Sequence, residues 1–157
     1  MAASLSGIGA MTAVIALAVV VAVLRRRIAV VAVIGSSMQP TLNAGDRVLV
    51  RRATIGDLRM GQIAVFERPD NERTWGTTPP RWPADRREWM IKRVAAVPGD
   101  RLPAGMLALC ITAEPAVPAG HVVVLGDNAA SSLDSRQLGY IPAERLLGVV
   151  LRPLARR

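Results

Sequence analysis

The feature that most constrains this chain is an apolar stretch close to its amino terminus. No charged residue occurs from Leu5 to Leu24, and most of the run consists of Ala, Val, Ile, Leu and Met. A helix of about 20 such residues spans roughly 30 Å, the hydrocarbon thickness of a bilayer. Basic residues follow the run at Arg25–Arg27, which is the reverse of the charge order in a cleaved signal peptide. The sequence therefore predicts one permanent transmembrane helix within residues 1–27, in preference to a buried core helix.

Beyond residue 27 the pattern changes to short β-branched or alternating runs separated by Gly, Pro and Asp, which favours strands joined by turns. The predicted strands cover residues 28–34, 47–51, 62–67, 89–97, 106–112, 121–125 and 145–151. Many short strands with turn signals between them are typical of an all-β domain. The sequence therefore predicts a mainly β fold, with a compact β domain over residues 28–157 behind the one N-terminal transmembrane helix.

The charge and composition narrow the classes of partner. The formal net charge is +8, but only 3% of the residues are aromatic and the arginines are scattered. A nucleic-acid-binding face needs clustered basic residues and rings that stack on bases. We therefore expect membrane lipid as a partner, and no nucleic acid, metal ion or cofactor. The single cysteine, Cys110, excludes an internal disulfide and sits in an apolar segment, as a buried thiol would.

Lys92 is the only lysine among the 20 Lys and Arg residues. A guanidinium stays protonated in a protein, whereas an ammonium can become a neutral amine that accepts a proton. One lysine retained by chance is the alternative explanation of the count. The neighbouring apolar residues Met90, Ile91 and Val94 favour the functional interpretation, because burial disfavours the charged form of an amine.

A hydroxyl that such a base would activate lies at Ser37, in the turn-rich segment 35–42. Peptide hydrolysis by a serine requires a base that takes the hydroxyl proton. His121, the one histidine, is the alternative base, but it stands beside three valines in a predicted strand with no carboxylate clearly placed to orient it. We favour a Ser37–Lys92 dyad and keep the Ser–His arrangement as the alternative.

Four segments, in order along the chain, resemble the sequence boxes of type I signal peptidases, the serine peptidases of family S26. Residues 37–46 resemble the nucleophile box, residues 92–100 the lysine box, and residues 126–139 the C-terminal box. Residues 61–66 resemble the remaining strand box, with Gln62 where the family usually has Asp. The resemblance covers most of residues 34–139 and implies a β-rich serine endopeptidase of the small, single-span kind.

The resemblance also implies roles for residues around the dyad. Ser132 matches a serine that orients the lysine amine, and Asp134 and Arg136 match a structural ion pair. Asp127 is likewise expected to be structural. The backbone N–H of Ser37 would bind the oxyanion.

Two further features of the site follow from the resemblance. Gly35 stands where many relatives carry a second hydroxyl donor to the oxyanion, so the Ser36 hydroxyl is the candidate substitute. Shallow apolar pockets beside the dyad would accept small side chains and select Ala-x-Ala-like cleavage sites; ordinary core packing is the alternative role for these residues. The expected lining residues are Val33, Met38, Leu42, Met90 and Ile91.

The function implied is signal peptidase I activity, in which a membrane-anchored enzyme removes signal peptides from secreted preproteins. A dedicated maturation peptidase for one or few precursors is the main alternative. LexA-type self-cleaving repressors also use Ser and Lys, but they need an N-terminal DNA-binding domain. A non-catalytic, membrane-anchored β module gives no reason for a single lysine. The sequence indicates no oligomeric state.

Charge and resemblance disagree about orientation in the cell membrane. The arginines at 25–27 favour a cytoplasmic domain under the positive-inside rule. A signal peptidase, however, meets its cleavage sites on the outer face, and Ser37 follows the apolar run closely. Because long domains can cross against the charge bias, we predict a single-pass protein with a cytoplasmic amino terminus and an extracytoplasmic catalytic domain.

Overall fold

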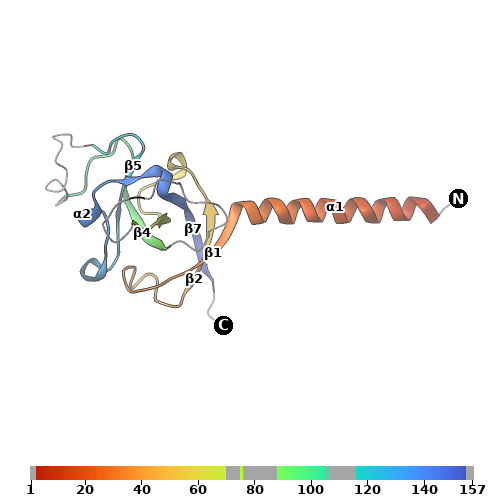
Figure 1. The fold of residues 1–157 in the computed structure, drawn as a ribbon, viewed down its shortest axis with the longest axis horizontal. Helices are drawn as coiled ribbons and strands as arrows, with labels where there is room; N and C mark the ends of the chain where they lie inside the picture. The colour runs from red at the N-terminus through yellow and green to blue at the C-terminus, as the bar shows by residue number, and fades with distance from the viewer. Residues whose placement is uncertain (1–2, 70–74, 76–87, 105, 107–115, 155–157) are drawn as a thin grey trace.

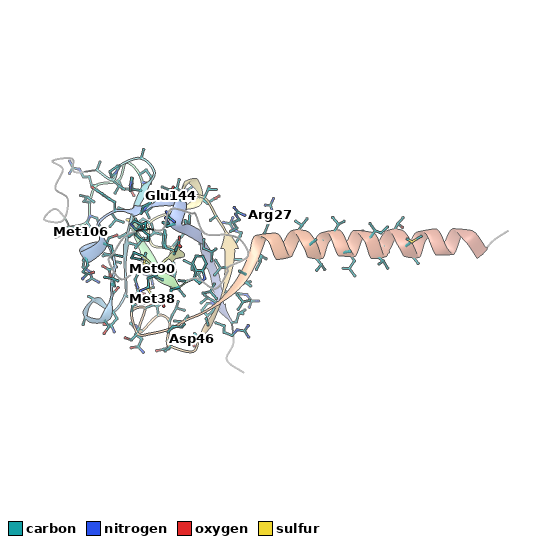
Figure 2. All side chains as sticks on the ribbon, in the orientation of Figure 1. Arg27, Met38, Asp46, Met90, Met106 and Glu144 are labelled. Carbon is teal, nitrogen blue, oxygen red and sulfur yellow. The ribbon has the colours of Figure 1, made fainter. Side chains whose placement is uncertain are left out.

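A long helix and a curled antiparallel sheet make up the structure, a computed structural model that describes residues 3–69, 75, 88–104, 106 and 116–154. Helix α1 (Ala3–Arg27) extends away from the β body as a single rod, and β1 begins at the next residue (Figure 1). Figure 2 shows its side chains standing free of the body, with Arg27 at the junction. The large apolar side chains exposed along it are Met11, Val14, Ile15, Leu17, Val19, Val20, Val21 and Val23.

Seven strands form the sheet in the order β1-β2-β7-β3-β4-β5-β6, and every neighbouring pair is antiparallel. The strands are β1 (Ile28–Ala32), β2 (Arg47–Arg52), β3 (Ile63–Glu67), β4 (Trp89–Ala96), β5 (His121–Leu125), β6 (Ile141–Pro142) and β7 (Leu146–Leu154). The last strand in sequence, β7, lies between β2 and β3 and hydrogen-bonds to both, so it joins the β1–β2 pair to the rest of the sheet.

Short helical turns connect the strands. A single turn of helix, α2 (Ser135–Leu138), follows β5 and begins at Asp134, whose side chain accepts a hydrogen bond from the Arg136 backbone N–H. Such a carboxylate satisfies an N–H group that has no partner within the helix. The three 3-10 turns are η1 (Ile55–Asp57), η3 (Ala129–Ser131) and η4 (Ala143–Arg145).

Two of the three apolar clusters found among the described residues fix the segments that carry the candidate dyad. One is built around Phe66 with Val94, Val122 and Val124, which joins β3, β4 and β5. The other contains Met38 and Leu42, each 1% exposed, together with Ile91 and strands β1 and β2. The residue after Ser37 and the residue before Lys92 are thus packed in the same cluster.

The mainly β fold expected from the sequence is confirmed, and the predicted strands agree with the observed ones to within a few residues. The first strand ends at Ala32 rather than at residue 34, because Gly35 adopts φ +84° and turns the chain. The short strand β6 was not predicted. The predicted strand 106–112 lies outside the described residues except for Met106, as does Cys110. Within the described part of the chain, no helix is long and apolar enough to count as a membrane span, so that prediction for α1 is not confirmed.

Candidate active site

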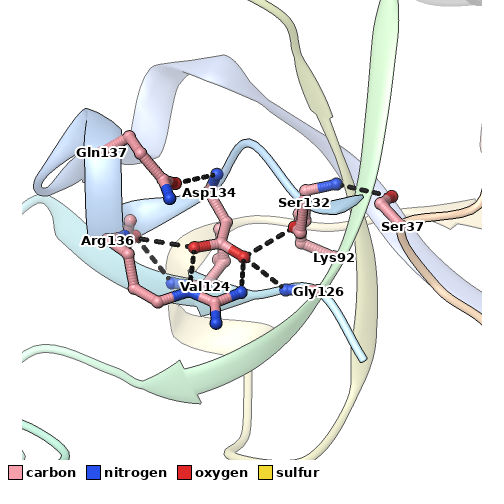
Figure 3. Close-up of polar contacts among 9 residues, drawn as sticks. Ser37, Lys92, Val124, Gly126, Ser132, Asp134, Arg136 and Gln137 are labelled. Carbon is pink, nitrogen blue, oxygen red and sulfur yellow. Dashed lines mark hydrogen bonds and ion pairs between the residues drawn. The ribbon is translucent and has the colours of Figure 1, made fainter. Parts of the chain in front are cut away.

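Ser37 and Lys92 lie side by side although they are far apart in sequence. The Lys92 side chain reaches from β4 to the turn that follows β1, where its Nζ lies 2.8 Å from Ser37 Oγ (Figure 3). That distance is within the range in which a base can take a proton from a hydroxyl. Lys92 is 4% exposed, whereas Ser37 is half-buried. The hydroxyl is therefore open to a substrate on one side and in contact with a shielded amine on the other.

The turn that carries Ser37 is held by the segment after β5. The Asn128 backbone N–H donates to the Ser37 carbonyl at 2.9 Å, and the Asn128 side-chain amide donates to the Ser36 carbonyl at 3.2 Å. Gly126 lies directly under this turn, because a Cβ placed there would be 2.6 Å from the Ser37 carbonyl oxygen. The position of the hydroxyl thus depends on a close backbone approach that only glycine permits.

Burial lowers the pKa of Lys92 below its ordinary value. The negative charge of Asp134 acts in the opposite direction, and the positive charges of Arg68 and Arg136 act in the same direction as burial. The net effect is a lowered pKa, so that a larger fraction of the amine is neutral near neutral pH than in a free lysine. A neutral amine is the form that accepts a proton from Ser37.

Asp134 is the centre of the network behind the dyad (Figure 3). Its buried carboxylate accepts hydrogen bonds from the Ser132 hydroxyl at 2.6 Å, from the Gly126 backbone N–H at 2.8 Å, and from the Arg136 guanidinium at 2.6 Å and 2.9 Å. Burial alone would raise the pKa of Asp134, but these hydrogen bonds, led by Arg136, lower it to about 2. The carboxylate therefore stays ionised and fixes the loop between β5 and α2.

Ser132 lies beside the dyad but makes a different contact from the expected one. Within the described residues, its hydroxyl hydrogen-bonds Asp134 and not the Lys92 amine. A carboxylate is a stronger acceptor than an amine that is itself bonded to Ser37. The hydroxyl proton goes to Asp134, while the oxygen keeps lone pairs with which to accept a hydrogen bond.

Asp127 is paired with Arg93, the residue after Lys92. The guanidinium binds both carboxylate oxygens, at 2.8 Å and 2.6 Å, and also donates to the Gly61 carbonyl at 2.8 Å. The Thr41 hydroxyl donates to the same carboxylate. The hydrogen bonds from Arg93 lower the pKa of Asp127 and outweigh the effect of burial. This group joins the nucleophile turn, β4 and the loop after β5.

A cleft of about 200 Å³ opens beside the dyad. Four of the residues expected to line pockets do line it, namely Val33, Met38, Met90 and Ile91, together with Ser36 and Ser37. Leu42 does not line this cleft; it is fully buried in the same core cluster as Met38. A side chain five residues after the nucleophile turns inward here, because the Leu42 N–H bonds the Met38 carbonyl and closes the turn.

Several contributors to the cleft were not singled out from the sequence. Arg68, Trp89, Ser131 and Leu133 line it as well. Leu133 could have been predicted to line the cleft, because it lies between Ser132 and Asp134 in the sequence. Nothing in the sequence around Arg68 distinguished it from the other arginines. Within the described residues, no group of three or more His, Cys, Asp or Glu side chains could hold a metal ion.

His121 lies away from the dyad at the start of β5. Its Nδ1 is 3.0 Å from the Ala119 carbonyl oxygen, and its ring packs edge-on against Tyr140 at 6.0 Å. In the described part of the chain it contacts neither Ser37 nor Lys92. The backbone N–H of Ser37 and the Ser36 hydroxyl have no hydrogen-bond partner among the described residues, so both are available to a ligand.

The sequence matches known proteins over most of its length. A family model described as "Signal peptidase, peptidase S26" matches residues 8–116 and 106–154. A probable signal peptidase I-2 from Synechocystis is 32% identical, with 72% of this chain aligned to 56% of that protein. Signal peptidase I from Bacillus caldolyticus is 29% identical over 74% of this chain and 73% of that protein.

A third relative comes from an organelle. It is the mitochondrial ATP-independent inner membrane protease subunit 1a of Arabidopsis thaliana, 32% identical over 74% of this chain and 64% of its own length. This chain therefore spans less than two thirds of two of these three relatives. The family match covers the residues that form the cleft and its supporting network, and on that ground the chain belongs to the signal peptidase family, peptidase S26.

Proposed function

We propose that this protein is a membrane-anchored serine endopeptidase that removes signal peptides from secreted preproteins. The observation that carries the proposal is the 2.8 Å contact between Lys92 Nζ and Ser37 Oγ at the end of a cleft. A shielded amine with a lowered pKa beside an accessible hydroxyl is the arrangement that serine acyl transfer needs.

In the proposed reaction, neutral Lys92 takes the Ser37 hydroxyl proton as Oγ attacks the scissile carbonyl carbon. The Ser37 backbone N–H and the Ser36 hydroxyl donate hydrogen bonds to the oxyanion that forms. The protonated amine then gives its proton to the departing amine nitrogen, which leaves an acyl ester on Ser37. Water, deprotonated by the same amine, hydrolyses the ester and regenerates the hydroxyl. Asp134, held by Arg136, favours the ammonium form that appears in between.

The shape of the cleft supports a preference for small side chains before the cleaved bond. The cleft has a volume of about 200 Å³, and its apolar walls include Val33, Met38, Met90 and Ile91. Large side chains would require these packed residues to move. We therefore propose Ala-x-Ala-like sites, with Leu42 left out of the specificity pockets.

For the membrane, we propose that residues 1–27 form the anchor and residues 28–157 the peptidase domain. The exposed apolar side chains along α1 support this division. Arg27 at the end of α1 shares a hollow with Arg51 and Arg52, and Arg51 pairs in register with Ile28. Guanidinium groups at the base of an apolar helix fit lipid phosphates. We further propose that the catalytic domain is extracytoplasmic.

The activity is tested with purified full-length protein and a preprotein bearing an Ala-x-Ala site. Ser37→Ala and Lys92→Arg should each abolish cleavage while retaining the thermal unfolding profile of the wild type. The arginine variant is informative because it keeps the positive charge and removes the base. Appreciable cleavage by a folded Lys92→Arg protein would refute the dyad.

Substrate range and orientation require separate experiments. A dedicated maturation peptidase for one or few precursors is the second candidate, since one relative is named as a protease subunit of a membrane and not as a signal peptidase. Proteomics of secreted proteins after depletion of this protein distinguishes the two candidates. Loss of a general enzyme leaves many uncleaved precursors, whereas loss of a dedicated one leaves few.

The orientation is tested with a Cys110→Ser protein that carries Ala44→Cys at an exposed position. The new cysteine should react in intact cells with a membrane-impermeant thiol reagent. Labelling only after lysis would place the domain inside.

A further inference from the structure

The cleft beside the dyad contains an arginine, Arg68, that takes no direct part in the proposed reaction steps. Among the described residues that line it, the charged ones are Arg68 and Lys92, and no carboxylate is present. The proposed reaction begins with Lys92 as a neutral amine. Arg68 then supplies the formal charge of the cleft, and a charge in a substrate-binding cleft discriminates between ligands of opposite sign.

The bonding of Arg68 leaves its guanidinium available to a substrate. Arg68 follows β3, and its backbone N–H donates to the Glu88 carbonyl at 2.9 Å, which extends the β3–β4 ladder. Its Nη1 also contacts Glu88 Oε2 at 2.9 Å, with side chains 51% and 76% exposed. Exposed ion pairs of this kind are weak and exchange readily. A guanidinium has five N–H donors, and this contact occupies one of them.

The carboxylate of Glu67, the preceding residue, is paired elsewhere and does not compete for Arg68. Glu67 is buried on β3 and accepts a hydrogen bond from the buried guanidinium of Arg145 at 3.0 Å. Glu88 itself does not line the cleft. Counting only residues in the described part of the chain, a carboxylate that enters with the substrate meets Arg68 with one solvent-exposed competitor, Glu88.

The position of Arg68 along the strands indicates which part of a substrate it would meet. Ala64 pairs with Lys92, and Glu67 pairs with Trp89. From Lys92 to Glu88 the chain covers four residues, or about 13 Å at about 3.3 Å per residue. Met90, Ile91 and Trp89 line the cleft over this stretch. In the proposed function these walls hold the residues that precede the cleaved bond, so Arg68 stands further along the same side.

We propose that Arg68 is a specificity-determining residue that binds a carboxylate side chain of the substrate, within about five residues on the amino-terminal side of the cleaved bond. The inference rests on the proposed peptidase activity and names its substrate class: precursors with an Asp or Glu shortly before a small-residue cleavage site. In the complex, the substrate carboxylate replaces Glu88 as the partner of the guanidinium.

The test measures kcat/KM of the full-length protein in detergent on three series of peptides with one Ala-x-Ala site. The series carry Glu, Gln or Lys in turn at the second, fourth and fifth positions before the cleaved bond, so that the Ala residues at the first and third positions stay in place. At the position that meets Arg68, the wild type should cleave the Glu peptide at least about fivefold better than the Lys peptide at low salt, with a smaller ratio at high salt.

Three variants identify the residue responsible. Arg68→Gln should bring the Glu-to-Lys ratio close to one, and Arg68→Glu should invert it. Arg68 also acts on the pKa of Lys92, so the ratio is taken within each variant, where a change in the rate common to all peptides cancels. Glu88→Gln removes the competitor and should increase the ratio. Arg152→Gln, at an exposed position on β7 outside the cleft, is the matched control and should leave the ratio unchanged.

The outcomes separate this inference from the proposed function. Cleavage of the Gln peptides with no charge preference at any position, or a preference unaffected by Arg68→Glu, would overturn the role of Arg68 and leave the peptidase intact. Failure to cleave every peptide and every preprotein would overturn the peptidase proposal itself. A ratio that changes equally in Arg152→Gln would show an effect of net charge and would also overturn the role of Arg68.

Discussion

Replacing Gly126 by alanine should disable the enzyme far more than it destabilises the fold. A Cβ at this position would lie 2.1 Å from Ser132 Oγ and 2.6 Å from the Ser37 carbonyl oxygen. Ordinary contacts begin near 3.4 Å, so the Ser37 backbone must move by roughly 0.8 Å to relieve its overlap. Rotation of the Ser132 side chain relieves only the contact with its Oγ, because its Cβ would also lie 2.6 Å away. Ser37 carries the hydroxyl that Lys92 activates, and a displacement of about 1 Å in a catalytic group lowers rates by about a hundredfold.

A matched control for Gly126→Ala is available in β7. A Cβ at Gly148 would lie 2.2 Å from the Arg51 carbonyl oxygen, which is an equally severe overlap with backbone but involves neither dyad residue. Overpacking of this kind costs about 1–3 kcal/mol of unfolding free energy at either position. Gly148→Ala should therefore lose stability and retain kcat/KM within a few-fold of the wild type.

The two variants are compared by urea unfolding and by kcat/KM on an Ala-x-Ala peptide. We expect similar losses of unfolding free energy, and a value of kcat/KM about a hundredfold lower in Gly126→Ala than in Gly148→Ala. Folded Gly126→Ala with a kcat/KM equal to that of Gly148→Ala would refute the idea that this close approach positions the nucleophile.

Two further predictions concern titrating groups. The pKa of Asp134 falls from 3.8 to about 2 on folding, so its ionised form stabilises the fold above pH 3.8, and that contribution is lost as the pH falls toward 2. The loss of unfolding free energy is about 2 kcal/mol. Urea unfolding between pH 5 and 2 should show this loss in the wild type and not in Asp134→Asn. Equal acid sensitivity of the two proteins would contradict the hydrogen-bond network around Asp134. His121→Gln should leave kcat/KM within a few-fold, because the ring contacts Ala119 and Tyr140; an inactive but folded variant would restore the Ser–His alternative.

The elements that the sequence predicted well are those whose signal is local. Short apolar and β-branched runs bounded by turn residues predicted the strands from β2 to β5 within a residue or two. In β2 buried residues alternate with more exposed ones, whereas β3, β4 and β5 contain consecutive buried residues and are thus covered on both faces. Ser37 and Lys92 were identified because each lies in a segment that resembles a box of the family. Lys92 was also marked out as the one lysine among arginines, since a lysine with apolar neighbours can become a neutral base and an arginine cannot.

Features that depend on the register between distant segments were not predictable in this way. The pairing of Arg93 with Asp127 arises only when β4 meets the loop after β5. Arg68 reaches the cleft because β3 and β4 pair in a particular register. Met38 and Leu42 are both apolar, close to Ser37 and part of the same core cluster, yet of these two only Met38 also lines the cleft.

The measurement that tests the central claim most directly is the titration of Lys92 itself. The chain has a single lysine, so labelling lysine alone with a stable isotope gives one side-chain signal in the NMR spectrum without further assignment. We predict a midpoint below the ordinary lysine value of 10.5, and a rise of kcat/KM with pH that has the same midpoint in the free enzyme. A Lys92 signal that titrates at or above 10.5 in the folded, active protein would contradict the assignment of this amine as the base.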